Sequence, residues 1–124
     1  MKASTQSILS HLNPEQLKAV THPAGALLVL AGAGSGKTRI LTRRIAFLIS
    51  GGAPAFNILG VTFTNKAAGE MKFRVTQLVH QEVWISTFHS SCVRMLRLDG
   101  RAIGLPRNFS IYDDHDQLVL IKEC

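Results

Sequence analysis

The sequence predicts an α/β fold with a parallel sheet, because short apolar runs typical of strands alternate with stretches of helical periodicity. Ala26–Leu30 is a continuous apolar run, as expected of a strand buried on both faces, and a glycine-rich segment follows it. After the glycines, Leu41, Ile45 and Leu48 recur at the spacing of one helical face. A strand, a glycine loop and a helix in this order are typical of the first half of a βαβ unit.

The elements of the first half of the chain follow from capping and breaking residues. Asn13–Gln16 has the composition of a helix start, with Asn as the N-cap, Pro at the first helical position and Gln at the third. Gly51-Gly52 is expected to end the helix that follows the glycine loop. Ile58–Phe63 predicts a second strand, and Asn65 is expected to cap the next helix.

The second half continues the alternation more weakly. Val83–Ile85 predicts a short strand, and Phe88–Leu98 predicts a helix that ends at Gly100. Phe109–Tyr112 is compatible with a fourth strand, and Asp114–Glu123 with a last helix.

Composition and charge limit the class of protein. A chain of 124 residues with 46% hydrophobic and 18% charged residues is expected to form one globular domain. The net charge of +6 favours a polyanionic partner, nucleic acid before a membrane surface. The first residues lack a signal-peptide pattern, and no apolar run approaches the roughly 20 residues of a membrane span. Cys92 and Cys124 have no metal-ligand spacing, so we expect a reduced, cytoplasmic setting.

Residues 31–38 (Ala-Gly-Ala-Gly-Ser-Gly-Lys-Thr) match the phosphate-loop pattern G-x-x-x-x-G-K-[ST] except for alanine at the first position. The glycines let backbone N–H groups face a phosphate, and the following helix N-terminus favours an anion. Lys37 is expected to reach the β- and γ-phosphates, and the Thr38 hydroxyl to ligate Mg²⁺. The alternative is a strand-to-helix turn without a ligand. The nucleotide contacts expected from this loop are Ala33, Gly34, Ser35, Gly36, Lys37 and Thr38.

Four stretches in this order resemble superfamily 1 DNA helicases of the UvrD/PcrA/Rep type. Leu12–Gln16 resembles the Q motif, Ala31–Arg39 the variant Walker A loop, Val61–Ala68 motif Ia, and Trp84–Ser90 the next DNA-contacting motif. The likeness continues through residues 108–117. It implies a P-loop NTPase fold, a RecA-like three-layer sandwich with a parallel sheet. Residues 1–124 are then the N-terminal, incomplete part of the first ATP-binding domain.

The resemblance implies roles for two residues near the loop. It assigns Gln16 to the adenine of ATP, and an amide side chain suits this role because it both donates and accepts hydrogen bonds. The alternative for Gln16 is its place in the helix cap. Arg39 is expected to stack on the nucleotide or to pair beside it, the alternative being a solvated helix residue.

The resemblance also implies a DNA contact at the ends of two strands. An aromatic side chain there can stack on an unpaired base, and a helix N-terminus can hold a backbone phosphate. The alternative is that the aromatic residues belong to the core, the capping residues only cap, and the histidine is structural. The residues expected to bind DNA are Phe63, Thr64, Asn65, Thr87, Phe88 and His89.

Hydrolysis of ATP needs a second carboxylate for Mg²⁺ and residues that act on the attacking water, which the family supplies from a Walker B motif and a second motor domain. The sequence contains neither. Asp113 is placed to approach Mg²⁺, but we favour a helix start in which Asp114 caps and Gln117 is the third residue.

The chain is therefore expected to be a fragment that ends at Cys124 inside a helix. The full protein would couple ATP hydrolysis to 3′-to-5′ movement on single-stranded DNA and at single-strand/duplex junctions, with accessory repair or replication proteins as possible partners and no membrane. The fragment alone would bind nucleotide weakly and not hydrolyse it. The alternatives are a P-loop nucleic-acid-binding module and a small P-loop kinase, neither of which has motor function.

Overall fold

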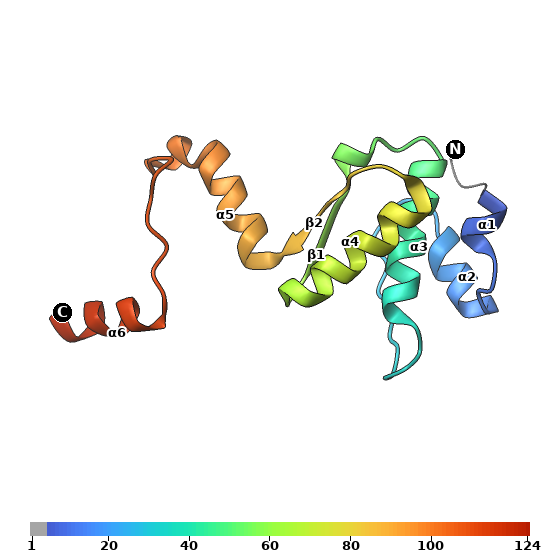
Figure 1. Cartoon of the computed structure of the whole chain (residues 1–124), viewed down its shortest axis with the longest axis horizontal. Coiled ribbons are helices and arrows are strands. Elements are labelled where there is room, and N and C mark those ends of the chain that lie inside the picture. Colours follow the sequence, from blue (N-terminus) through green and yellow to red (C-terminus); the bar gives the residue numbers. More distant parts are fainter. Residues whose placement is uncertain (1–4) are drawn as a thin grey trace. The chain divides into compact units, whose positions relative to one another are not determined.

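The computed structural model describes residues 5–124 (Figure 1). The chain divides into two compact units, Met1–Phe88 and His89–Cys124. The first unit combines helices with a two-stranded parallel sheet, so the predicted α/β class is confirmed at this coarse level. Its elements are α1 (Thr5–Leu9), α2 (Pro14–Thr21), α3 (Lys37–Ser50), the 3₁₀ turn Ala55–Asn57, β1 (Leu59–Thr62), α4 (Asn65–Val79) and β2 (Trp84–Thr87).

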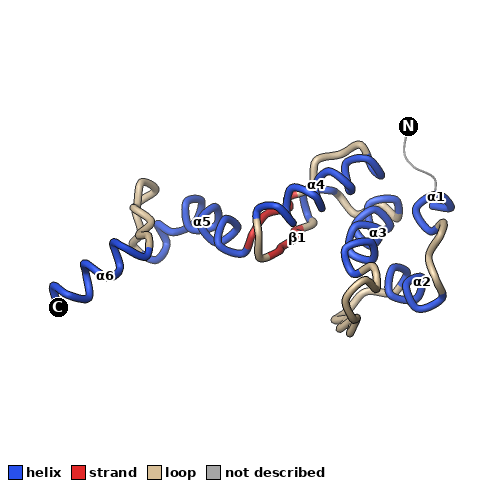
Figure 2. Tube along the Cα trace, turned by 60° about the horizontal axis from the view of Figure 1, so that its bottom comes forward, coloured by secondary structure: helices blue, strands red, loops and turns tan. Residues whose placement is uncertain are grey.

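The sheet pairs β1 with β2 in parallel, and α4 is the crossover between them (Figure 2). The register places Thr62 opposite Thr87, so both strands end at the same edge of the sheet. The segments that follow β1 and β2 therefore begin next to each other. This edge is where ligands of open α/β sheets bind.

The main core lies where α3 and α4 pack with the sheet. Ile45 and Ile49 of α3 meet Met71 and Val75 of α4, and all four are buried, as expected from their helical spacing. A smaller cluster of Ala19, Val20 and Ile40 joins α2 to α3. The core thus holds together the helix that follows the phosphate loop and the helix that follows β1.

The expected helix ends are mostly confirmed. Asn13 and Gln16 form the capping box of α2, and α3 ends at Ser50 with Gly51 as its C-cap. The prediction that Asn65 caps α4 is wrong by one residue. The cap is Thr64, whose hydroxyl accepts a hydrogen bond from the N–H of Ala67 at 3.1 Å. Both residue types cap well, and the backbone becomes helical at Asn65.

The strand predicted at Ala26–Leu30 does not form. Leu28 and Leu30 are 82% and 87% exposed, and no described strand pairs with this segment. A strand needs neighbours for its backbone groups and cover for both faces, and residues 5–124 supply neither at this place.

The second unit continues α5 (Phe88–Asp99) from His89 and contains the 3₁₀ turn Gly100–Ile103 and α6 (Asp114–Glu123). The helix predicted at residues 88–98 is confirmed, whereas the weak strand predicted at residues 109–112 is wrong. Phe109 is held instead by the Arg97 guanidinium, 5.7 Å from its ring centroid. No described strand lies beside residues 109–112, so their backbone groups have no strand to pair with.

The start of α6 corrects a second capping assignment. The cap is Asp113, not Asp114, and the third helical residue is Asp116, not Gln117. The Asp113 carboxylate accepts from the N–H of Asp116 at 2.8 Å, and the Asp116 carboxylate accepts from the N–H of Asp113 at 3.1 Å. No described helix is long and apolar enough to span a bilayer.

Candidate functional site

The phosphate loop owes its shape to glycines in the left-handed region. Gly34 and Gly36 have φ of 74° and 82°, a region where a side chain is strained. Gly36 is also the N-cap of α3 and provides no side-chain cap, so the first N–H groups of α3 have no capping oxygen. The residues thus fit a phosphate group, which would accept hydrogen bonds from these N–H groups.

The carbonyl of Gly32 is the centre of the loop's own hydrogen bonds. It accepts from the Ser35 hydroxyl at 2.6 Å and from the Lys37 ammonium at 2.7 Å, and the Ser35 N–H lies 3.3 Å away. Lys37 also donates to the carbonyl of Ala31 at 3.3 Å. The cation predicted to bind phosphates therefore lies across the loop, in contact with carbonyl oxygens that a phosphate would replace.

Gln16 is hydrogen-bonded at both ends of its amide. Its Oε1 accepts from the N–H of Asn13 at 3.1 Å, which completes the predicted capping box. Its Nε2 donates to the carbonyl of Ser35 at 3.0 Å. The structure therefore brings the predicted adenine-reading residue directly against the phosphate loop, although the two are far apart in sequence.

The other predicted nucleotide residues lie around the same loop. Ala33 is exposed between the glycines, and Thr38 is half-buried in the first turn of α3. Arg39 is exposed one residue further along. A small cavity next to the loop is lined by Lys37, Ile40, Leu41 and the apolar side chains of Leu27 and Val29. The nucleotide residues predicted from the sequence thus gather around one loop.

The predicted DNA residues of the first unit lie at the common edge of the two strands. Phe63 follows β1 and Phe88 follows β2, and their ring centroids are 5.2 Å apart with an interplanar angle of 42°. Phe63 is 88% exposed and Phe88 45%, so both rings present surface to solvent. Core packing, the alternative considered for Phe63, does not hold.

Thr87 and Asn65 differ from the aromatic pair in exposure and role. Thr87 ends β2 and is only 7% exposed, so its side chain supports the edge from within. Asn65 is exposed at the first position of α4, beside the capping hydroxyl of Thr64. The N-terminus of α4 therefore follows Phe63 by two residues in the sequence, and a helix N-terminus can attract a phosphate.

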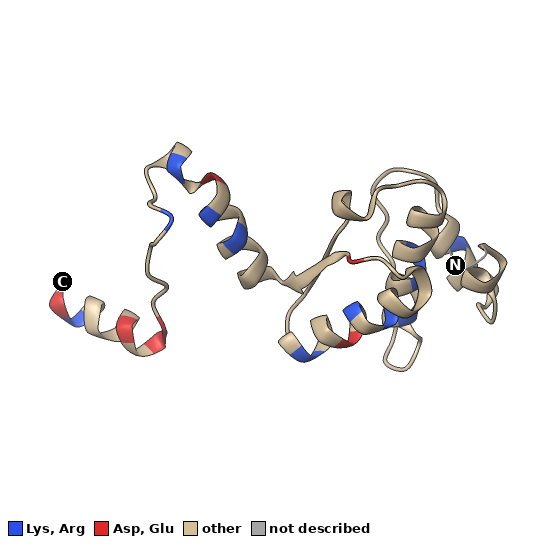
Figure 3. Cartoon of the chain, turned by 45° about the horizontal axis from the view of Figure 1, so that its top comes forward, with Lys and Arg blue, Asp and Glu red and all other residues tan. Residues whose placement is uncertain are grey.

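His89 belongs to the second unit and is described there. It is exposed and lines an open groove of α5 with Arg94, Arg97, Val93 and other residues. Figure 3 shows basic residues along α5 and mostly acidic ones on α6. The groove that contains His89 is lined by no acidic residue.

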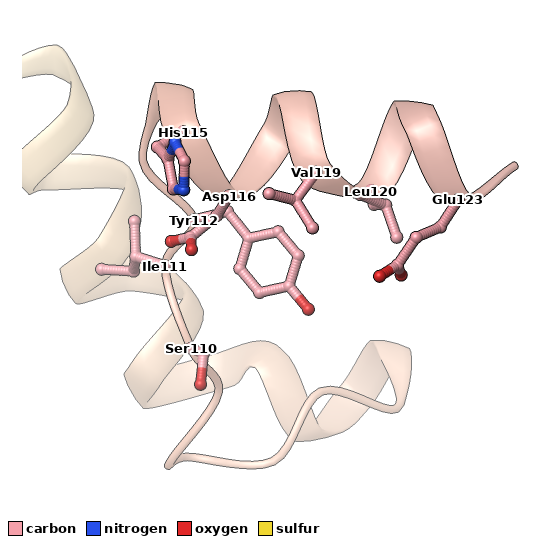
Figure 4. A pocket seen from close by; sticks show the side chains of 8 residues that line it. All are labelled: Ser110, Ile111, Tyr112, His115, Asp116, Val119, Leu120 and Glu123. Carbon is pink, nitrogen blue, oxygen red and sulfur yellow. The ribbon is translucent and has the colours of Figure 1, made fainter.

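The acidic residues at the start of α6 do not resemble a metal site. Asp113 and Asp116 are each engaged with a backbone N–H of the capping box. Figure 4 shows Asp116 and His115 beside Tyr112 at the rim of a second pocket, along which Val119, Leu120 and Glu123 follow. The capping interpretation of this stretch, shifted by one residue, therefore explains the two carboxylates.

Sequence reasoning missed two arginines of α3 that contact the ends of α1 and α2. Arg43 and Arg44 donate to backbone carbonyls of those helices. Their positions in the sequence did not predict these contacts, since an arginine on a helix is usually solvated. Their partners are carbonyl groups, which no sequence pattern marks.

A loop shaped by glycines at the start of a helix, with a lysine and a threonine after it, is the arrangement typical of phosphate-binding loops. The chain belongs to the UvrD/REP helicase N-terminal domain family, whose members it matches over residues 12–124. It is 53% identical over 121 residues to the ATP-dependent DNA helicase PcrA of Staphylococcus aureus, covering 94% of this chain. The identity to the ATP-dependent DNA helicase PcrA of Staphylococcus epidermidis is also 53%. The chain spans 17% of the length of these relatives.

Proposed function

We propose that the chain is the N-terminal part of the first RecA-like ATP-binding domain of an ATP-dependent DNA helicase. The observation that carries this proposal is the hydrogen bond of 3.0 Å from Gln16 to the carbonyl of Ser35. It joins a side chain suited to adenine with a loop suited to phosphates. The family and the name of the relatives, ATP-dependent DNA helicase, support the same function.

In this proposal the phosphate loop binds ATP through its own groups. The N–H groups of Gly34 to Thr38 bind phosphate oxygens, for which the Ser35 N–H and the Lys37 ammonium both leave the Gly32 carbonyl. Lys37 then neutralises the β- and γ-phosphates. Thr38 would hold Mg²⁺, which would neutralise charge on the phosphates. Gln16 reads the adenine, and Arg39 lies close enough in sequence to the loop to pair with the nucleotide.

DNA binds at the edge where the two parallel strands end. The exposed rings of Phe63 and Phe88 offer a stacking surface for unpaired bases, which suits single-stranded DNA better than a duplex. The N-terminus of α4, with Thr64 and Asn65, receives a backbone phosphate. His89 adds a base or phosphate contact in the second unit.

The full protein would then move 3′-to-5′ on a single strand, as the family resemblance implies, in DNA repair or replication.

The test is ATP hydrolysis by the full-length protein with and without single-stranded DNA, with Lys37→Ala as the blank. We expect hydrolysis that DNA stimulates and that the substitution abolishes. The 124-residue chain alone is expected not to hydrolyse ATP, because the residues that act on the attacking water would come from elsewhere in the protein. Phosphoryl transfer to a small acceptor in place of hydrolysis would overturn the helicase proposal.

A further inference from the structure

Arg44 closes the C-terminal end of α2. Its Nη1 donates to the carbonyl of Val20 at 2.8 Å and to the carbonyl of His22, and its Nη2 lies 3.4 Å from the carbonyl of Pro23. The last carbonyls of a helix have no partner within the helix, and a cation is favoured there. The side chain is half-buried, so water screens these bonds less than at an open surface.

Arg43, its neighbour on α3, makes the same kind of contact with a different helix. Its Nη1 donates to the carbonyls of Ser7 and Ile8 in α1, at 2.5 and 2.6 Å. Burial lowers the pKa of the Arg43 guanidinium, and the nearby charge of Arg39 lowers it further. The two arginines are therefore alike in that both lie on α3, are half-buried and donate to backbone carbonyls, but of the two Arg44 contacts the helix that carries Gln16.

The proposed nucleotide site needs such a link because it consists of two separate pieces of chain. Gln16 lies on α2, whereas the phosphate loop precedes α3. The connecting residues 26–30 form no strand, and Leu28 and Leu30 are almost fully exposed, so this connection constrains the two pieces less than a paired strand would. The position of α2 depends on its contacts with α3.

Among the described residues, three kinds of contact hold α2 on α3 and the loop. One is the apolar cluster of Ala19, Val20 and Ile40, which gives no directional constraint. The second is the single neutral hydrogen bond from Gln16 to Ser35. The third is Arg44, whose bonds are charge-assisted and directed at the end of α2 opposite to Gln16. Fixing both ends of this helix of eight residues fixes its orientation.

We propose that Arg44 is a positioning residue for adenine recognition: by holding the end of α2 on α3, it keeps Gln16 against the phosphate loop. This inference rests on the proposed function, in which Gln16 reads the adenine. Without Arg44, α2 tilts about its apolar contact and the Gln16 amide loses its fixed place. Recognition of the base then suffers more than binding of the phosphates, because α2 contacts the loop through one hydrogen bond while the left-handed backbone of Gly34 and Gly36 gives the loop its own shape.

The test compares Arg44→Ala with Arg43→Ala in the full-length protein. Dissociation constants are measured for ATP, GTP and inorganic tripolyphosphate, and thermal unfolding is followed for each variant. Small displacements of a binding group weaken recognition strongly, so we expect the preference for ATP over GTP to fall about 5- to 10-fold in Arg44→Ala. Arg43→Ala is expected to keep the preference for ATP over GTP, although its thermal stability should fall by about as much as that of Arg44→Ala. Tripolyphosphate binding should be nearly unchanged in both.

Arg44→Lys is a second variant, which tests the inference if Arg44→Ala does not fold. A lysine keeps the charge but lacks the planar fork, so it binds fewer of the three carbonyls, and an intermediate preference is expected. An unchanged preference in the Arg44 variants, with stability lowered as in Arg43→Ala, would overturn the inference and leave a structural role only. An unaltered protein that fails to bind ATP would overturn the proposed function as well.

Discussion

The rings of Phe63 and Phe88 meet with their centroids 5.2 Å apart, although each residue follows a different strand. The parallel register that places Thr62 opposite Thr87 brings them together. Tilted aromatic pairs at this separation attract each other, and here the pair remains open to solvent. An exposed aromatic pair buries little surface, so this pair contributes little to the core.

Replacing Phe63 or Phe88 with alanine is expected to weaken binding of single-stranded DNA. Stacking on an aromatic side chain contributes about 1–3 kcal/mol per base, which corresponds to roughly 5- to 150-fold in the dissociation constant. Fluorescence anisotropy with a labelled oligonucleotide measures this change. Phe63 is 88% exposed, so Phe63→Ala should leave stability within about 0.5 kcal/mol of the unaltered protein.

Phe56→Ala is the matched control for the aromatic pair. Phe56 is 83% exposed in the 3₁₀ turn before β1, away from the edge where the strands end. Its loss should not change DNA affinity. Equal weakening by all three substitutions would mean that exposed phenylalanines bind DNA without a defined site, and the aromatic pair would lose its assigned role.

Replacing Gln16 with glutamate separates its two hydrogen bonds. A glutamate still accepts from the N–H of Asn13 and so keeps the capping box, but its carboxylate cannot donate to the carbonyl of Ser35. We expect near-normal helix content by circular dichroism and a clear loss of the preference for ATP over GTP. Gln77→Glu, on the exposed part of α4, adds the same charge elsewhere. A retained preference in Gln16→Glu would show that Gln16 only caps α2.

Replacing Lys37 with alanine is expected to reduce ATP hydrolysis by the full-length protein to background. Lys37 is exposed and contacts only loop carbonyls among its described hydrogen bonds, so its removal should cost little stability. Lys72→Ala is the control, since Lys72 is an exposed lysine of α4 that lies 3.8 Å from Glu82 in a weak surface ion pair. A steady-state hydrolysis assay distinguishes the two, and residual activity in Lys37→Ala above that of a no-protein sample would contradict the assigned role.

The sequence was sufficient for the parts of the fold that depend on local contacts. The capping box of Asn13 and Gln16, the end of α3 at Ser50 and the helix after Phe88 all depend on residues within one or two turns. The strand expected at residues 26–30 failed because strand formation depends on neighbours that are distant in sequence. The caps at Thr64 and Asp113 were missed by one residue, because adjacent polar residues compete for the same position.

The candidate site shows the same division. The motif identified the loop residues, because the pattern itself encodes their chemistry. It did not predict that Lys37 would bind the Gly32 carbonyl or that Arg44 would bind the end of α2. Both contacts are made to backbone oxygens, which every residue possesses, so only the three-dimensional structure shows which ones are used.

The last prediction concerns Gly60, which lies in β1 with its Cα surrounded by the core. A Cβ at this position would lie 3.1 Å from Cγ1 of Ile85 and 3.6 Å from both Cδ1 of Ile45 and Sδ of Met71. Overpacking of a core typically costs about 1–3 kcal/mol, so Gly60→Ala should lower the free energy of unfolding by an amount in this range. The effect should appear as a lower midpoint in chemical denaturation.

Gly69→Ala is the matched control, because the same methyl group is added where a Cβ would meet no atom within 4 Å. Gly69 lies inside α4, where alanine is favoured over glycine by about 0.5–1 kcal/mol, so this variant should be more stable than the unaltered protein. Opposite signs for the two substitutions are expected because one addition meets the packed sheet and the other meets solvent. If Gly60→Ala were as stable as Gly69→Ala, the close packing of β1 against Ile85, Ile45 and Met71 would be wrong, and with it the register that brings Phe63 and Phe88 together.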